Sequence, residues 1–98
     1  MPTYLDVDPR TLHLPPGMWQ GANPGKLARQ LSKFGTSTAG MPPLFVHTDP
    51  DGRLMLMDGV TRAARVAKCL PGVLVRVEVI GTEPQPVASY PTVADRLP

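Results

Sequence analysis

The stretch MPPLFVHTDPDGRLMLMDGVTRAARVAKCLPGVLVRVEVI, residues 41–80, decides the fold of this chain. Its first half holds two apolar runs, at 44–47 and 53–57, on either side of the turn sequence DPDG at 49–52. Because Pro, Asp and Gly favour tight turns, this pattern predicts two strands joined by a short connection. The second run is almost continuously apolar, which predicts burial on both faces and a central place in a sheet.

The second half of the stretch predicts a helix and a further strand. The helix is expected over about residues 59–70, because the Pro-Gly pair at 71–72 stops it. Residues 73–80 then alternate, with Arg76 and Glu78 on one face and valines on the other. The order strand, turn, strand, helix, strand predicts a small α/β (α+β) domain with a short mixed sheet.

The first forty residues add a second main helix. Asn23 is a preferred N-cap and Pro24 suits the first helical position, so a helix is predicted to begin there and to end at Gly35. Residues 4–8 predict a short edge strand that Pro9 ends. The apolar residues of the helix form one stripe, which consists of Leu27, Leu31 and Phe34.

Composition bounds the size and setting of the domain. Ninety-eight residues, 42% of them hydrophobic, are enough for one small core. A net charge of +2 is too modest to indicate nucleic-acid binding by itself. The chain has no signal-peptide pattern and no membrane-length apolar run, and its single cysteine fits a reducing compartment. We therefore expect a cytoplasmic protein without membrane contact, with a domain over residues 1–80 and an extended proline-rich tail over 81–98.

The junction between the second strand and its helix is the main candidate site. Asp58 follows the strand directly and is predicted to cap the helix, its carboxylate accepting from the N–H of Val60 or Thr61. Gly59 permits a tight turn and the close approach of a ligand. The free N–H groups of the first helical turn then point outward, which favours the binding of an anion.

Two arginines strengthen this prediction. Arg62 and Arg65 lie three residues apart in the first turns of the helix, where cations oppose the helix dipole. A phosphate held between them and the N–H groups explains their position, and the hydroxyl of Thr61 can donate to the same anion. The alternative is an i,i+4 ion pair between Asp58 and Arg62, with Arg65 merely solvated.

Other polar side chains have simpler explanations beside the functional ones. The basic face of the first helix, formed by Lys26, Arg29 and Lys33, can contact nucleic-acid phosphates or serve only solubility. His13, flanked by leucines, is more often structural than catalytic, and Cys69, late on the second helix, is more often a small core residue. The sequence predicts no dedicated metal site.

The chain resembles the ParB/sulfiredoxin-like superfamily over about residues 5–80. The resemblance rests on Asn23-Pro24 before a short helix, on the proline-led strand PPLFV at 42–46, and on DGRLMLMDGVTRAA at 51–64. Family members share a proline-led strand, a tight turn, a second strand that ends in an acidic or small residue plus Gly, and an Arg shortly afterwards. The resemblance implies a compact α/β domain of this type.

The same resemblance implies a nucleotide phosphate site at the junction, with Gly59 and Arg62 matching the family's Gly and Arg. ParB-type proteins bind and hydrolyse CTP and sulfiredoxin uses ATP, so CTP or ATP with Mg is the implied cofactor. The sulfiredoxin cysteine falls at Val60, so that redox activity is not expected. Val60 and Thr61 also replace the acidic residue and the arginine of ParB, which puts hydrolysis in doubt and leaves Asp58 as the one candidate catalytic carboxylate.

Three functions compete at this stage. The leading hypothesis is a stand-alone domain that binds a nucleotide or another phosphorylated small molecule at residues 58–65, with doubtful turnover. The second is a protein-interaction module that has kept the fold without the ligand and contacts a partner through the tail and the loop at 36–43. The third is a nucleic-acid-binding accessory protein that uses the basic residues of both helices.

Overall fold

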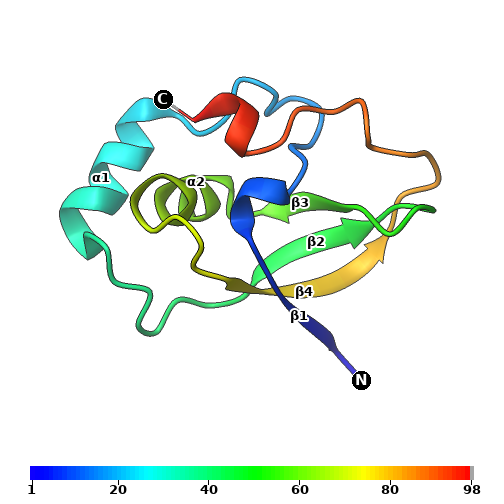
Figure 1. Ribbon diagram of the computed structural model, residues 1–98, viewed down its shortest axis with the longest axis horizontal. Helices are drawn as coiled ribbons and strands as arrows, with labels where there is room; N and C mark the ends of the chain where they lie inside the picture. Colours follow the sequence, from blue (N-terminus) through cyan, green and yellow to red (C-terminus); the bar gives the residue numbers. More distant parts are fainter. Residues whose placement is uncertain (98) are drawn as a thin grey trace.

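The computed structural model describes residues 1–97 and contains a four-stranded mixed sheet, with α2 against one face and α1 packed on α2 (Figure 1). Pro98, the last residue of the expected tail, lies outside the described residues. This arrangement confirms the predicted α/β class and the mixed sheet with two main helices. Among residues 1–97, no helix is both long and apolar enough to cross a membrane. The elements are β1 (Thr3–Val7), η1 (Pro9–Thr11, a 3₁₀ turn), α1 (Pro24–Phe34), β2 (Leu44–Thr48), β3 (Leu54–Asp58), α2 (Val60–Cys69), β4 (Val75–Thr82) and η2 (Ala94–Arg96, a 3₁₀ turn).

The strands follow the order β1-β4-β2-β3 across the sheet. β2 and β3 form the predicted antiparallel hairpin, and β4 returns parallel to β2 after a crossover through α2. A parallel pair cannot be joined by a tight turn, so the intervening helix supplies the long connection it needs. β1 lies antiparallel to β4 at an outer edge, as its sequence predicted.

The predicted central place of the strand at 53–57 is wrong, because β3 lies at the edge of the sheet. Its outer side is covered by an irregular segment rather than by a fifth strand. The N–H of His13 donates to the carbonyl of Leu54 over 2.9 Å, and the N–H of Leu56 donates to the carbonyl of His13 over 2.9 Å. An apolar run indicates that a strand is shielded from solvent, but it does not show whether a neighbouring strand or an irregular segment shields it.

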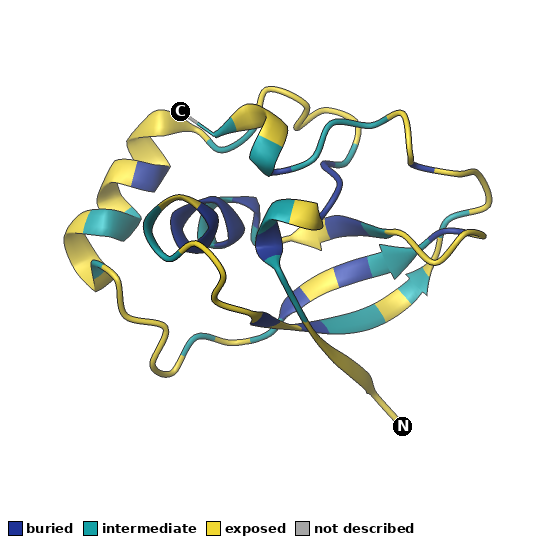
Figure 2. Ribbon diagram, in the orientation of Figure 1, coloured by how far each residue is buried: buried dark blue, intermediate teal, exposed yellow. Residues whose placement is uncertain are grey.

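The core lies between α2 and the inner face of the sheet (Figure 2). The buried residues of α2 are small or medium-sized aliphatic side chains, and they pack in one cluster with those of the sheet. This packing makes α2 the most deeply buried helix of the fold. The core residues on α2 are Val60, Ala63, Ala64, Val66 and Ala67, and those on the sheet are Leu44, Val46, Leu56, Val75 and Val77.

The caps of α1 are those the sequence predicted. The side chain of Asn23 accepts hydrogen bonds from the N–H groups of Gly25 and Lys26, and Gly35 ends the helix with a positive φ of 57°. The predicted apolar stripe is only partly buried. Leu27 reaches the core, whereas Phe34 at the far end remains 42% exposed.

The described part of the expected tail packs back onto the domain, which is one of the outcomes that its sequence left open. β4 continues past residue 80 to Thr82, and the following chain crosses over the outer side of the hairpin (Figure 1). The N–H of Val93 donates to the carbonyl of Leu12, and the N–H of Leu14 donates to the carbonyl of Pro91. The described part of the segment is therefore a component of the fold, and no structural boundary separates it from residues 1–80.

The buried carboxylate of Asp49 joins the hairpin turn to this C-terminal segment. It accepts from the N–H groups of Asp51 and Arg53 within the turn and from that of Val87, which lies far away in sequence. Burial by itself raises the pKa of Asp49, but the three backbone N–H donors and the nearby charge of Arg53 outweigh it and hold that pKa below its usual range.

We expect Asp49→Asn to lower the melting temperature by roughly 5–15 °C. The carboxylate accepts three backbone N–H bonds through two oxygens, whereas the amide has only one oxygen. Its NH₂ group then lies against at least one of these backbone N–H donors, and the two donors cannot bond to each other. Thermal unfolding followed by circular dichroism measures the effect. The matched control is Asp51→Asn in the same turn, where the carboxylate pairs with Arg53 in an exposed position. Such a pair contributes little, so the control should lie close to wild type. Equal melting temperatures for both variants would contradict the role of Asp49.

The same variant makes a pH dependence testable. The folded-state pKa of Asp49 lies below its unfolded value, so its contribution is present above the unfolded pKa and is lost as the pH falls through the folded one. The difference in melting temperature between wild type and Asp49→Asn should therefore be full near pH 7 and shrink below about pH 4. A difference that stays constant down to the acid limit of the measurement would show that the carboxylate charge plays no part.

Candidate functional site

A single glycine connects β3 to α2, as the sequence predicted. β3 ends at Asp58, α2 begins at Val60, and Gly59 between them has a φ of 92°. A Cβ atom at this position would lie 2.5 Å from a methyl group of Leu44 and 3.0 Å from the guanidinium of Arg62. Both the backbone conformation and the close approach therefore require glycine here.

The predicted capping role of Asp58 is wrong. The N-cap is Gly59, and no side chain caps α2. Asp58 remains the last residue of β3, paired with Phe45, and its carboxylate is directed to solvent with 66% of the side chain exposed. The first N–H groups of α2 have no intrahelical acceptor, and no side chain among the described residues caps them.

Arg62 adopts the alternative that the sequence left open. One of its terminal nitrogens lies 3.7 Å from a carboxylate oxygen of Asp58, in an i,i+4 ion pair. The other donates to the carbonyl of Pro42 over 3.0 Å. Arg62 therefore stays at the start of α2, with its charge shared between Asp58 and the chain that leads into β2.

Arg65 does not join this site. It is 2% exposed, and its Nη1 atom donates to the carbonyls of Gly35 and Ser37 over 3.0 and 2.7 Å. The guanidinium also lies 5.5 Å from the centre of the Phe34 ring. Three residues of helix turn a side chain by about 300°, so Arg65 faces the chain after α1 while Arg62 faces β2. The expectation of a shared phosphate and the alternative of a solvated Arg65 are both wrong for this residue.

An open depression of about 390 Å³ surrounds the start of α2, and we call it the α2-start depression. Its volume falls within the range of small-molecule sites. Two of its residues come from α1: Lys26, which the sequence assigned only to the basic face of that helix, and Gln30, which the sequence did not single out. Their spacing of four residues was a signal that both lie on one face of the helix, but only the packing of α1 on α2 brings that face to the junction. The polar residues of the depression are Lys26, Gln30, Asp58, Thr61 and Arg62.

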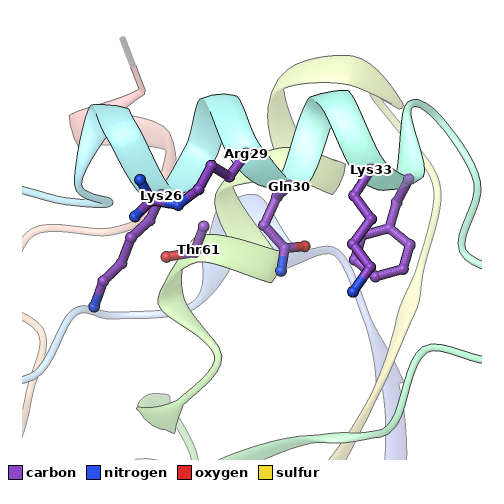
Figure 3. Close-up of a pocket in the computed structure, with 6 residues that line it drawn as sticks. Lys26, Arg29, Gln30, Lys33 and Thr61 are labelled. Atoms are coloured by element: carbon purple, nitrogen blue, oxygen red, sulfur yellow. The ribbon is translucent and has the colours of Figure 1, made fainter.

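A second depression of about 310 Å³ runs along α1, and we call it the α1 groove. Lys26, Arg29 and Lys33 line it together with Thr61. Figure 3 shows these basic side chains on α1 and the hydroxyl-bearing Thr61 on the neighbouring turn of α2. The predicted basic face thus adjoins the start of α2, and Lys26 belongs to both depressions.

The two remaining candidate residues are His13 and Cys69, and both lie away from the start of α2. His13 is buried, bridges β3 to Thr92, and its Nδ1 atom lies 2.9 Å from the carbonyl oxygen of Tyr90. Cys69 is a free, half-buried residue at the end of α2. The position of His13 agrees with the structural role that the sequence favoured, whereas Cys69 lies outside the core cluster in which the sequence placed it.

The carboxylates available for a metal ion are few. Within residues 1–97, no group of three or more His, Cys, Asp or Glu side chains is placed to hold one. Asp58 is the single carboxylate among the described residues that line the α2-start depression. Mg²⁺ is commonly bound by one or two carboxylates together with the phosphates of its ligand. The residues therefore fit a Mg²⁺ ion that arrives with a polyphosphate, held on the protein side by Asp58.

Comparison with known proteins gives no relative for this chain. No protein-family model, no curated protein and no solved structure matches it.

The hydrogen bonds of Arg65 predict its role in ordering the chain after α1. Arg65→Lys keeps the charge but shortens the side chain and loses the Nη1 group that donates to both carbonyls, so we expect a loss of about 1–3 kcal/mol in the free energy of unfolding. Amide hydrogen exchange should become faster at residues 36–41. The matched control is Arg53→Lys, since Arg53 makes only an exposed pair in the hairpin turn. Unchanged exchange at 36–41 in Arg65→Lys would contradict this role.

Proposed function

We propose that this protein binds a phosphorylated small molecule, with a nucleotide as the leading candidate, in the α2-start depression. The observation that carries the proposal is the uncapped start of α2, whose first residues line the same depression as Lys26 and Arg62. A helix start attracts an anion through its N–H groups and its dipole, and two cationic side chains add charge at the same point. Thr61 supplies a further hydroxyl donor.

The depression contains both attractive and repulsive elements for a phosphate. The N–H groups and Lys26 attract an anion, whereas Arg62 is shared with Asp58 at 3.7 Å. A phosphate has to compete with this carboxylate for the guanidinium, and it gains a stronger, charge-assisted bond if it succeeds. Asp58 therefore sets the affinity, either as a competitor for Arg62 or as a partner for a metal ion bound to the phosphates.

We propose that the protein binds this phosphorylated ligand, and we do not propose that it hydrolyses the ligand or transfers its phosphate. Phosphoryl transfer depends on several positioned groups around the reacting phosphate. Among the described residues, Asp58 is the one carboxylate that lines the depression, and it is strongly exposed and already paired with Arg62. The resemblance to ParB/sulfiredoxin-type domains supports a nucleotide as the ligand, because the matching Gly59 and Arg62 both lie in this depression.

Titration with CTP, ATP and GTP, with and without Mg²⁺, tests the proposal by calorimetry. We expect saturable binding that Arg62→Ala and Lys26→Ala each weaken by roughly 10- to 100-fold, since each removes a charge-assisted contact. The matched control is Arg76→Ala, an exposed arginine on β4 that pairs with Asp6 outside the depression. The absence of saturable binding, or equal effects of Arg62→Ala and Arg76→Ala, would overturn the proposal.

A variant of Asp58 separates its two roles in the same titrations. Asp58→Asn releases Arg62, so binding without Mg²⁺ should become tighter if the carboxylate only competes with the phosphate. Tighter binding without Mg²⁺ but weaker binding with it assigns the carboxylate to the metal ion. Unchanged binding under both conditions would contradict the contact between the phosphate and Arg62.

Nucleic acid is the second candidate, and the α1 groove favours it. Lys26, Arg29 and Lys33 line this groove as a row of cations beside Thr61 (Figure 3). Such a row suits successive backbone phosphates, and their neutralisation makes binding strongly dependent on salt.

A double variant distinguishes the two candidates. Arg29 and Lys33 line the α1 groove but not the α2-start depression. Arg29→Ala with Lys33→Ala should therefore leave nucleotide affinity unchanged and weaken the binding of a single-stranded oligonucleotide. Filter binding between about 50 and 200 mM salt measures the second effect. Oligonucleotide binding that is absent, or that neither salt nor the double variant changes, would remove nucleic acid as a candidate.

A further inference from the structure

The two outer edges of the sheet have different surroundings. At the β3 edge, the backbone of His13 bonds to Leu54 and Leu56, so an irregular segment occupies this side. β1 forms the opposite edge, where β4 is its strand partner. Within residues 1–97, no backbone hydrogen bond outside this pairing reaches residues 3–7. Because an edge strand directs every second N–H and C=O pair away from its sheet, β1 presents a row of unpaired backbone groups.

The sequence of β1 does not protect this edge from another strand. Lysines, prolines within the strand and β-bulges commonly keep a sheet edge from pairing. β1 reads TYLDV and contains none of these, and its register with β4 is continuous from Thr3 to Val7. Its single charge is Asp6, whose two carboxylate oxygens accept from Arg76 over 3.0 and 3.2 Å. Figure 1 shows the N-terminal end of β1 extending beyond the rest of the domain, so a second strand can approach it.

An apolar row of the inner sheet face runs to this edge and stops there. Leu44 on β2 is the register partner of Val77 on β4, and Val77 is the register partner of Leu5 on β1. Directly paired residues point to the same face, so Leu5 lies on the face that carries the core. Leu44 and Val77 are completely buried, whereas Leu5 is 42% exposed, as is most of β1 (Figure 2). The row therefore ends in a leucine that a further strand would cover.

We propose that β1 pairs antiparallel with β1 of a second copy of this chain, so that the two sheets become one. The two-fold axis passes between the two Leu5 residues, and each leucine covers the other. Thr3 of one copy then lies opposite Val7 of the other, and Tyr4 lies opposite Asp6. Because the axis is perpendicular to the sheet, both inner faces lie on the same side and their apolar rows become continuous.

The sequence of the strand indicates a second copy as the partner, because it complements itself in one register. With the axis at Leu5, all five residues of β1 find a partner and no like charges meet. An axis at Asp6 sets the two aspartates against each other. An axis at Tyr4 sets Asp6 against Pro2, which has no N–H to donate. No residue of β1 lines the α2-start depression or the α1 groove, so this inference does not rest on the proposed function.

Sedimentation equilibrium of the full chain between about 5 µM and 1 mM tests the proposal. One short pair of strands gives a small interface, so we expect a reversible monomer–dimer equilibrium with a Kd of roughly 10–500 µM. Amide hydrogen exchange at residues 3–7 should become slower as the protein concentration rises, because the outward N–H groups become bonded. A chain that stays monomeric throughout this range overturns the proposal, and so does a dimer that leaves exchange at residues 3–7 unchanged.

Charge variants of Leu5 test the position of the axis. Leu5→Lys and Leu5→Glu each place two like charges face to face, so each should weaken the dimer at least roughly 10-fold. An equimolar mixture of the two variants should form a heterodimer, because lysine then faces glutamate. The matched control is Ile80→Lys, which changes an exposed apolar residue of β4, and β1 separates that strand from the second copy. Equal weakening by Leu5→Lys and Ile80→Lys, or a mixture that remains monomeric, overturns the proposed pairing.

Discussion

The core that α2 shares with the sheet sets the positions of the other elements. Ala63, Ala64 and Ala67 are buried in the core cluster that α2 shares with the strands. The helix is also the crossover that makes β2 and β4 parallel. With its axis fixed in this way, its first turn has to follow β3 after a single residue, so Gly59 is confined between Leu44 and Arg62.

The position of α2 also decides the different environments of its two arginines. Arg62 lies at the rim, where Asp58 and the carbonyl of Pro42 share its charge. Arg65, one turn further on, is directed into the chain between α1 and β2 and is almost completely buried. The same residue type thus serves as a surface cation near the helix start and as an internal anchor. The difference comes from about 60° of rotation around the helix axis.

Long-range contacts close the fold along the outer edge of β3. Leu14 bonds to Pro91 and Leu12 bonds to Val93, so two irregular segments hold each other against the outer edge of β3. Asp49 adds a third link through the N–H of Val87. Proline-rich segments rarely form regular strands, but they can still supply single hydrogen bonds and buried side chains where a sheet edge is open. This explains why a segment without apolar periodicity became part of the domain.

The local elements and the direct strand-to-helix connection at Gly59 could be predicted from the amino-acid sequence. Turn residues, apolar periodicity and the caps of α1 depend on neighbouring residues, so the hairpin, both main helices and the role of Gly59 were readable from the chain. The surfaces that meet in the fold could not be predicted in this way. β3 lies at the edge of the sheet, and Asp58 does not cap α2. Lys26 lies at the start of α2, and Arg65 is buried. These outcomes depend on contacts between residues far apart in sequence and on the rotation of each helix. Burial and charge pairing are properties of the assembled fold, whereas a sequence pattern shows only which residues are available for them.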